Sequence, residues 1–93
     1  MKSIELIQVR SFSESNRQQV IDMLKSLPET GPGIPSNIQI FENQIQTTDL
    51  CICLFWDQTQ LHFVKSALGE NLAAAFKIFG WISYSVWNPL QEE

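Results

Sequence analysis

The chain has 93 residues, a formal net charge of −4 and a hydrophobic share of 44%. Its six Lys and Arg residues are scattered singly, which argues against nucleic acid or an anionic membrane as a partner. This length predicts one domain over residues 1–93 with a modest core. There is no signal-peptide pattern and no apolar run long enough to span a bilayer, so we expect a cytoplasmic protein.

The first predicted strand covers residues 4–12 and is partly apolar on both faces, since positions 4, 6, 8 and 10 share one face and positions 5, 7 and 9 the other. A helix follows. Ser15 and Gln18 fit the capping box that begins many helices. Pro28 is predicted to end it. Its apolar stripe consists of Val20, Met23, Leu24 and Leu27.

A turn-rich loop is predicted over residues 29–36, which hold two Gly and two Pro. This loop lacks the lysine and the glycine spacing of a phosphate-binding loop. Residues 37–46 predict a second strand, and their polar character is typical of a sheet edge. The short turn over residues 47–49 then leads into the third strand as a hairpin.

The third strand is an unbroken apolar run from Leu50 to Trp56, with an aspartate on either side. Such a run indicates a strand that is buried on both faces. Cys51 and Cys53 share one face of it and could be half of a metal site or a redox pair. Because a zinc site needs about four ligands, we prefer two reduced, buried thiols and expect no metal and no cofactor.

A second helix is predicted over roughly residues 58–79, because apolar residues recur there at steps of three and four. These residues are Leu61, Val64, Leu68, Leu72, Phe76 and Phe79. Asp57 and Thr59 are candidate caps. Gly69 predicts a kink near the middle of the helix, and Gly80 is expected to end it.

Residues 81–87 predict a fourth strand, with both of its Trp residues on one face and Tyr84 on the other. The order β-α-β-β-α-β predicts an α+β, ferredoxin-like fold in which two helices cover one face of a four-stranded antiparallel sheet. The other face then exposes a large apolar patch, which soluble monomers rarely tolerate. We therefore expect a homodimer that is joined sheet to sheet.

Three stretches carry a family resemblance: the run 49–56, the pairs Lys65-Ser66 and Leu68-Gly69, and Gly80-Trp81 with the strand that ends at Trp87. They resemble the dimeric α+β barrel superfamily, in particular its antibiotic-biosynthesis-monooxygenase-like and stress-responsive families. The resemblance covers nearly the whole chain in element order and length. It implies a homodimer whose two sheets close into a barrel, with a possible small-molecule pocket between each sheet and its helices.

Some members of that superfamily oxidise aromatic substrates without a cofactor, and others degrade haem. Their sites combine an Asn on the first strand, a Trp at the end of the third and, in haem degraders, a His on the second long helix. Trp56 matches the Trp position, and Gln8 is the amide nearest to the missing Asn. Lys65 stands where the His is expected, about one turn after His62, so the resemblance does not extend to haem binding.

The candidate substrate-binding residues are Trp56, His62, Tyr84 and Gln8, and the first three also have a plainer interpretation. Trp56 and Tyr84 are typical core residues, whereas His62 lies off the apolar stripe and is either a surface residue or a general base in a pocket. Two functions stay open. The preferred one is a non-catalytic homodimer with a structural, partner-binding or small-molecule-binding role, and the possible ligand is apolar or aromatic. The alternative is a cofactor-independent monooxygenase-like enzyme that acts on a small aromatic or polyketide-like substrate.

Overall fold

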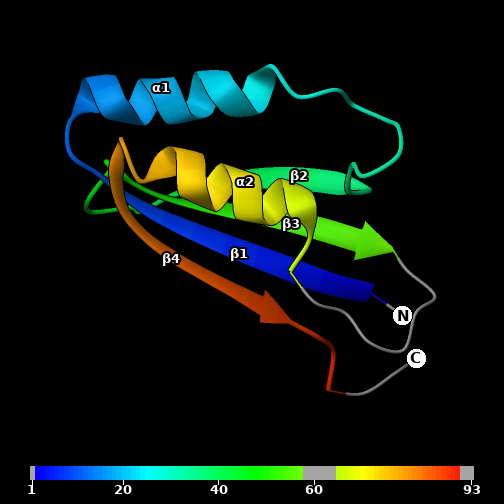
Figure 1. The fold of residues 1–93 in the computed structure, drawn as a ribbon. Coiled ribbons are helices and arrows are strands. Elements are labelled where there is room, and N and C mark those ends of the chain that lie inside the picture. Colours follow the sequence, from blue (N-terminus) through cyan, green and yellow to red (C-terminus); the bar gives the residue numbers. More distant parts are fainter. Residues whose placement is uncertain (1, 58–64, 91–93) are drawn as a thin grey trace.

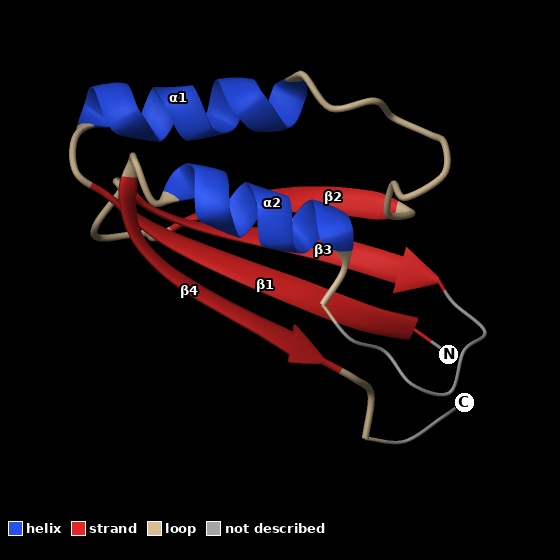
Figure 2. Ribbon diagram, viewed as in Figure 1, coloured by secondary structure: helices blue, strands red, loops and turns tan. Residues whose placement is uncertain are grey.

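The computed structural model describes residues 2–57 and 65–90 (Figure 1). Its elements are β1 (Lys2–Ser11), α1 (Glu14–Lys25), β2 (Asn37–Glu42), β3 (Asp49–Asp57), α2 (Ala67–Phe76) and β4 (Gly80–Trp87). The strands form one antiparallel sheet in the order β2-β3-β1-β4, and both helices lie on the same side of it (Figure 2). The predicted element order and the α+β class are confirmed. In the described part of the chain, no helix has the length and apolarity that crossing a membrane requires.

Alternation along the strands sorts the side chains onto two faces of the sheet. The register pairs Glu5 of β1 with Leu54 of β3 and with Val86 of β4, so all three share the helix-covered face. The large side chains of the core on this face are Ile7, Val9, Leu50, Ile52, Leu54, Leu72 and Phe76, with Val20 and Leu24 from α1. Burying each of these side chains stabilises the fold by about 1.5–3 kcal/mol before entropy is counted.

The opposite side of the sheet, here called the helix-free face, also carries apolar side chains. Its apolar and aromatic members are Ile4, Leu6, Phe41, Cys51, Cys53, Phe55, Trp81 and Trp87. Cys53 is buried by its neighbours and Cys51 is half-buried, so the prediction that both thiols are buried is correct only for Cys53. β3 therefore has apolar side chains on both faces, as its unbroken run predicts.

The start of α1 differs from the prediction. The cap is Ser13, whose Oγ accepts a hydrogen bond from the Asn16 N–H at 3.1 Å. The predicted capping box of Ser15 and Gln18 is wrong, because both residues already lie within the helix. The Gln18 amide instead donates to the Asp22 carboxylate, one turn further along, at 2.9 Å.

Two elements end earlier than predicted, because side chains there bind the backbone. α1 ends at Lys25, where the hydroxyl of the C-cap Ser26 donates to a carbonyl of the last turn at 2.7 Å, and Pro28 lies beyond the end. β2 ends at Glu42 rather than at residue 46. Oδ1 of Asn43 accepts from two backbone N–H groups, at 2.9 and 2.8 Å, and so forms a turn in place of further strand.

The second helix is shorter than the predicted span of 58–79 in the part that the structure describes. α2 begins after Ser66, whose Oγ caps it by accepting from the Gly69 N–H at 2.9 Å. Gly69 therefore lies in the first turn, and the predicted mid-helix kink is wrong. Asp57, a predicted cap, is the last residue of β3. The predicted helix residues Thr59, Leu61 and Val64 lie outside the described residues.

Gly80 is the first residue of β4 rather than the residue that directly follows the helix. A Cβ at this position would lie 2.8 Å from the carbonyl carbon of Arg10, which is closer than real Cβ contacts come. Glycine thus allows the start of β4 to approach the end of β1. The neighbouring hydrogen bond from the Phe12 N–H to the Phe79 carbonyl, at 2.9 Å, closes this corner of the sheet.

Candidate functional site

The structure brings two of the four predicted site residues together and separates a third from them. Trp56 at the end of β3 and Tyr84 in β4 both lie on the helix-covered face, on either side of β1. Gln8 projects from the helix-free face, where it is exposed. His62 lies outside the described residues.

A buried carboxylate that the sequence analysis did not select links the two aromatic residues. Glu5 in the middle of β1 is 0% exposed. The Trp56 Nε1–H donates to its Oε1 at 2.7 Å, and the Tyr84 hydroxyl donates to its Oε2. Ser66 adds two donors, its backbone N–H to Oε2 at 2.9 Å and its hydroxyl to Oε1 at 2.7 Å. The carboxylate thus has the hydrogen bonds that a buried polar group requires.

The Glu5 carboxylate lies at the N-terminus of α2, where backbone N–H groups and the helix dipole favour a negative charge. Ser66 connects the two, because one hydroxyl both caps the helix and donates to Glu5. Gly69 makes the close approach possible, since a Cβ there would lie 2.6 Å from Glu5 Oε2 and closer still to the Tyr84 hydroxyl. The first turn of α2 therefore rests directly on the carboxylate.

Tyr84 is held as a neutral donor in this cluster. Burial, followed by its hydrogen bond to Glu5, raises the pKa of the Tyr84 phenol well above its ordinary value. The Lys65 ammonium lies over the Tyr84 ring, 4.8 Å from its centroid. The polar atoms of Trp56 and Tyr84 are thus directed at Glu5, and the contact they make joins β1, β3, β4 and α2.

The sequence did contain a signal for Glu5, although one that is easily overlooked. Glu5 shares its strand face with Ile7 and Val9, and a charge on such a face is either solvated at its edge or buried with partners. Its partners could not be identified from the sequence because Trp56, Ser66 and Tyr84 follow it by 51, 61 and 79 positions.

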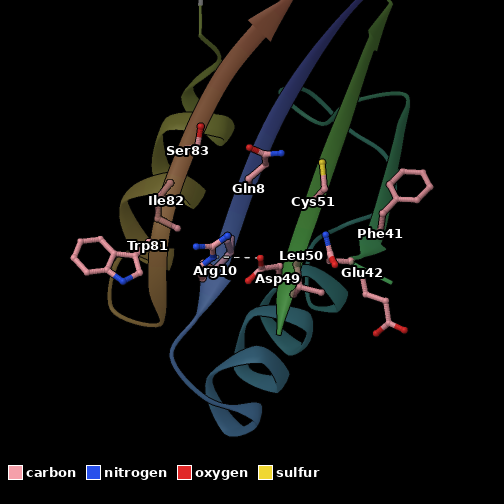
Figure 3. A pocket seen from close by; sticks show the side chains of 12 residues that line it. Gln8, Arg10, Phe41, Glu42, Asp49, Leu50, Cys51, Trp81, Ile82 and Ser83 are labelled. Carbon is pink, nitrogen blue, oxygen red and sulfur yellow. Dashed lines mark hydrogen bonds and ion pairs between the residues drawn. The ribbon is translucent and has the colours of Figure 1, made fainter. Parts of the chain in front are cut away.

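A groove of about 660 Å³ opens on the helix-free face, near the ends of the sheet where β1 stops and β3 starts (Figure 3). The register sets its floor in two rows that cross the strands. In one row, Gln8 stands between Cys51 and Ser83; in the next, Arg10 stands between Asp49 and Trp81. The other half of this face is more apolar, with Ile4, Leu6, Cys53, Phe55 and Trp87.

An ion pair lies on the floor of the groove. The Arg10 Nε–H donates to Asp49 Oδ2 at 3.2 Å, and the Arg10 side chain is 73% exposed (Figure 3). Within residues 2–57 and 65–90, the terminal nitrogens of Arg10 make no hydrogen bond to the protein. These nitrogens are directed donors that a carboxylate can engage.

The two cysteines of this face are free thiols, with their sulfur atoms 4.0 Å apart. Burial, with a smaller effect of the neighbouring Cys51, raises the pKa of Cys53 to about 11. Cys53 is therefore a neutral thiol at physiological pH, whereas nucleophilic and metal-ligating cysteines act as thiolates. Among the side chains that the structure describes, no group of three or more His, Cys, Asp or Glu residues is placed to hold a metal ion.

The part of the chain that the structure describes thus contains two places with unusual polar side chains: the buried Glu5 cluster under α2, and the groove around Arg10 on the helix-free face. The first is closed by its own hydrogen bonds, and the second is open. Comparison of the chain with protein-family models, with curated proteins and with solved structures finds no match.

Proposed function

We propose that this chain is a non-catalytic, small-molecule-binding protein that works as a homodimer, with the helix-free faces of two copies packed together as in a dimeric α+β barrel. The observation that carries the proposal is the composition of that face. Both central strands direct apolar side chains to it, and β4 adds Trp81 and Trp87, which are exposed in the protomer. Apolar surface of this extent usually marks a site of association.

The size of the face supports association with a second copy. Its four strands have 10, 6, 9 and 8 residues, so at about 3.3 Å per residue and about 4.8 Å between strands the face covers roughly 520 Å². Two copies would then bury about 1,000 Å², which is near the lower limit for a specific interface.

The charges on the face also permit two copies to meet. The chain has a net charge of −4, yet Arg10 and Asp49 compensate each other on this face. Two identical faces can therefore approach without the like-charge repulsion that the whole chain would suggest.

The alternative, a cofactor-independent monooxygenase-like enzyme, has less support from the geometry. Such an enzyme would need the polar groups of Trp56 or Tyr84 to reach a substrate between the sheet and the helices. Both groups instead donate to Glu5, which is itself fully buried. A buried network whose donors and acceptors are all paired stabilises a core and leaves little for a ligand to bind.

Sedimentation at micromolar concentration tests the proposed dimer directly. The wild-type chain should sediment at about twice its mass of 10.7 kDa. Leu6→Glu places a charge at the centre of the face and should yield a monomer. Ile78→Glu, at an exposed apolar position after α2, is the matched control and should remain a dimer.

Circular dichroism should show that both variants are folded. A monomeric wild-type chain would overturn the proposal. A folded Leu6→Glu variant that is still a dimer would place the interface on another surface and would equally overturn it.

A further inference from the structure

We infer that the groove on the helix-free face binds a small, planar aromatic carboxylate, with Arg10 as the residue that recognises its negative charge. This inference rests on the proposed dimer, because the sheet of the second copy would close the groove. Its volume of about 660 Å³ lies within the roughly 300–1,000 Å³ that is usual for small-molecule sites.

The charge of the ligand follows from the ion pair on the groove floor. Asp49 engages only the Nε of Arg10, and no other residue in the described ranges bonds the guanidinium, so both terminal nitrogens are left for an anion. A guanidinium fork binds a planar carboxylate through two parallel hydrogen bonds. Next to Arg10, the Gln8 amide and the Ser83 hydroxyl lie side by side in the register and add further hydrogen-bonding groups.

The aromatic character of the ligand follows from the rims of the groove. Trp81 of β4 and Phe41 of β2 stand at opposite sides and are 73% and 52% exposed (Figure 3). Trp81 makes an edge-to-face contact with Phe12, at 6.1 Å between ring centroids, which fixes the orientation of its ring. Large exposed aromatic rings gain stability when another aromatic ring covers them.

The second copy of the chain would turn the open groove into an enclosed chamber. Enclosure removes water from Arg10 and from the aromatic rims, and an ionic hydrogen bond is stronger in such surroundings. The apolar half of the face, around Leu6 and Phe55, would supply the contact between the sheets, whereas the hollow half would hold the ligand.

Isothermal titration calorimetry of the full chain with two matched probes tests this inference. The probes are 2-naphthoate and its neutral analogue 2-naphthamide. We expect saturable binding of 2-naphthoate and binding of 2-naphthamide that is weaker by about tenfold or more, since hydrogen bonds to charged groups are the stronger ones.

The matched variant is Arg10→Gln combined with Asp49→Asn, which removes both charges and leaves the net charge of the face unchanged. It should bind the two probes equally, with an affinity close to that of 2-naphthamide for wild type. Lys25→Gln, at an exposed position on α1, removes a positive charge elsewhere and should bind 2-naphthoate like wild type.

The outcomes separate the two proposals. A wild-type dimer that binds neither probe would overturn the inference and leave the proposed dimer standing. A dimer that binds both probes equally, or a double variant that still prefers 2-naphthoate, would overturn the role of Arg10. A monomeric wild-type chain would overturn the proposed function together with this inference.

Discussion

Glu5 accounts for the way in which three strands and a helix meet in this small domain. Burying a carboxylate costs several kcal/mol unless its oxygen atoms are paired. Here, donors from Trp56, Ser66 and Tyr84 satisfy both oxygen atoms. Removing any one of these donors leaves part of a buried charge unpaired, so each donor affects stability far more than a surface hydrogen bond would.

Trp56→Phe tests this reading of the cluster. The substitution keeps most of the apolar volume and removes the indole N–H that donates to Glu5. We expect the free energy of unfolding to fall by about 1–3 kcal/mol, measured by urea denaturation. Gln18→Ala is the control, because the Gln18 amide donates to Asp22 on the exposed surface of α1 and its loss should change stability by less than about 0.5 kcal/mol. Equal effects of the two substitutions would contradict the assignment.

Two side chains whose pKa values are raised in the folded state, Cys53 and Tyr84, predict how stability depends on pH. Burial raises the pKa of Cys53 to about 11 from an ordinary value of 9.0, and the pKa of Tyr84 is raised as well. Because the folded state then binds protons more tightly, the stabilisation is complete below pH 9 and is lost as the pH rises through 11. For Cys53 the loss amounts to at most about 3 kcal/mol.

Urea denaturation between pH 7 and 11 at constant protein concentration measures this loss. In Cys53→Ala, the free energy of unfolding should no longer begin to fall near pH 9. The decrease that remains at higher pH should come from Tyr84. A wild-type profile that stays level up to pH 11 would show that neither proton is held more tightly in the folded state.

At the scale of elements, α2 is positioned by its first turn. Ser66 caps the helix and bonds Glu5, and Gly69 leaves the space into which the carboxylate and the Tyr84 hydroxyl fit. The starting residue of α2 is therefore determined by these contacts with the sheet and not by local helix propensity.

The substitution Gly69→Ala distinguishes the intrinsic helix propensity of this position from the steric fit of α2 against Glu5 and Tyr84. In an ordinary helix this change stabilises by about 1 kcal/mol. Here the added Cβ would lie 2.6 Å from Glu5 Oε2, so we expect a net loss of stability and a lower midpoint of urea denaturation. Ala74→Gly, at an exposed position of the same helix, should lower the free energy of unfolding by about 1 kcal/mol. It therefore measures the effect of helix propensity alone. A Gly69→Ala chain that is more stable than wild type would disprove the close contact.

Some elements could be predicted from the sequence and others could not, and the difference lies in how far apart the interacting residues are. The order of strands and helices, and the apolar side chains on both faces of β3, follow from the hydrophobic pattern within each segment. The start of α2 could not be predicted, because it depends on Glu5, which is 61 positions away from Ser66. The groove around Arg10 was missed for a related reason: it exists only when all four strands lie side by side, and the residues on its floor look ordinary along the chain.

At the scale of the whole molecule, the proposed dimer predicts that thermal stability depends on protein concentration. Association stabilises the folded state by mass action, so the Tm should rise as the chain concentration increases from about 1 to 100 μM. Differential scanning fluorimetry measures this, and the Leu6→Glu variant serves as the control with a constant Tm. A wild-type Tm that does not change with concentration would argue for an independent monomer.

The strand order also affects how the chain reaches its folded state. β1 is made first, yet it lies between β3 and β4, which follow much later in the sequence. During synthesis, β1 therefore has no paired neighbour until β3 has been made. Its second neighbour, β4, is complete only once residues 80–87 have been made. Such long-range pairing slows folding and leaves an unpaired strand that can bind another chain. A nascent chain that stops before β4 would thus present an open β1 edge, and its Glu5 carboxylate would lack the hydrogen bond from Tyr84, a form that quality-control chaperones are suited to capture.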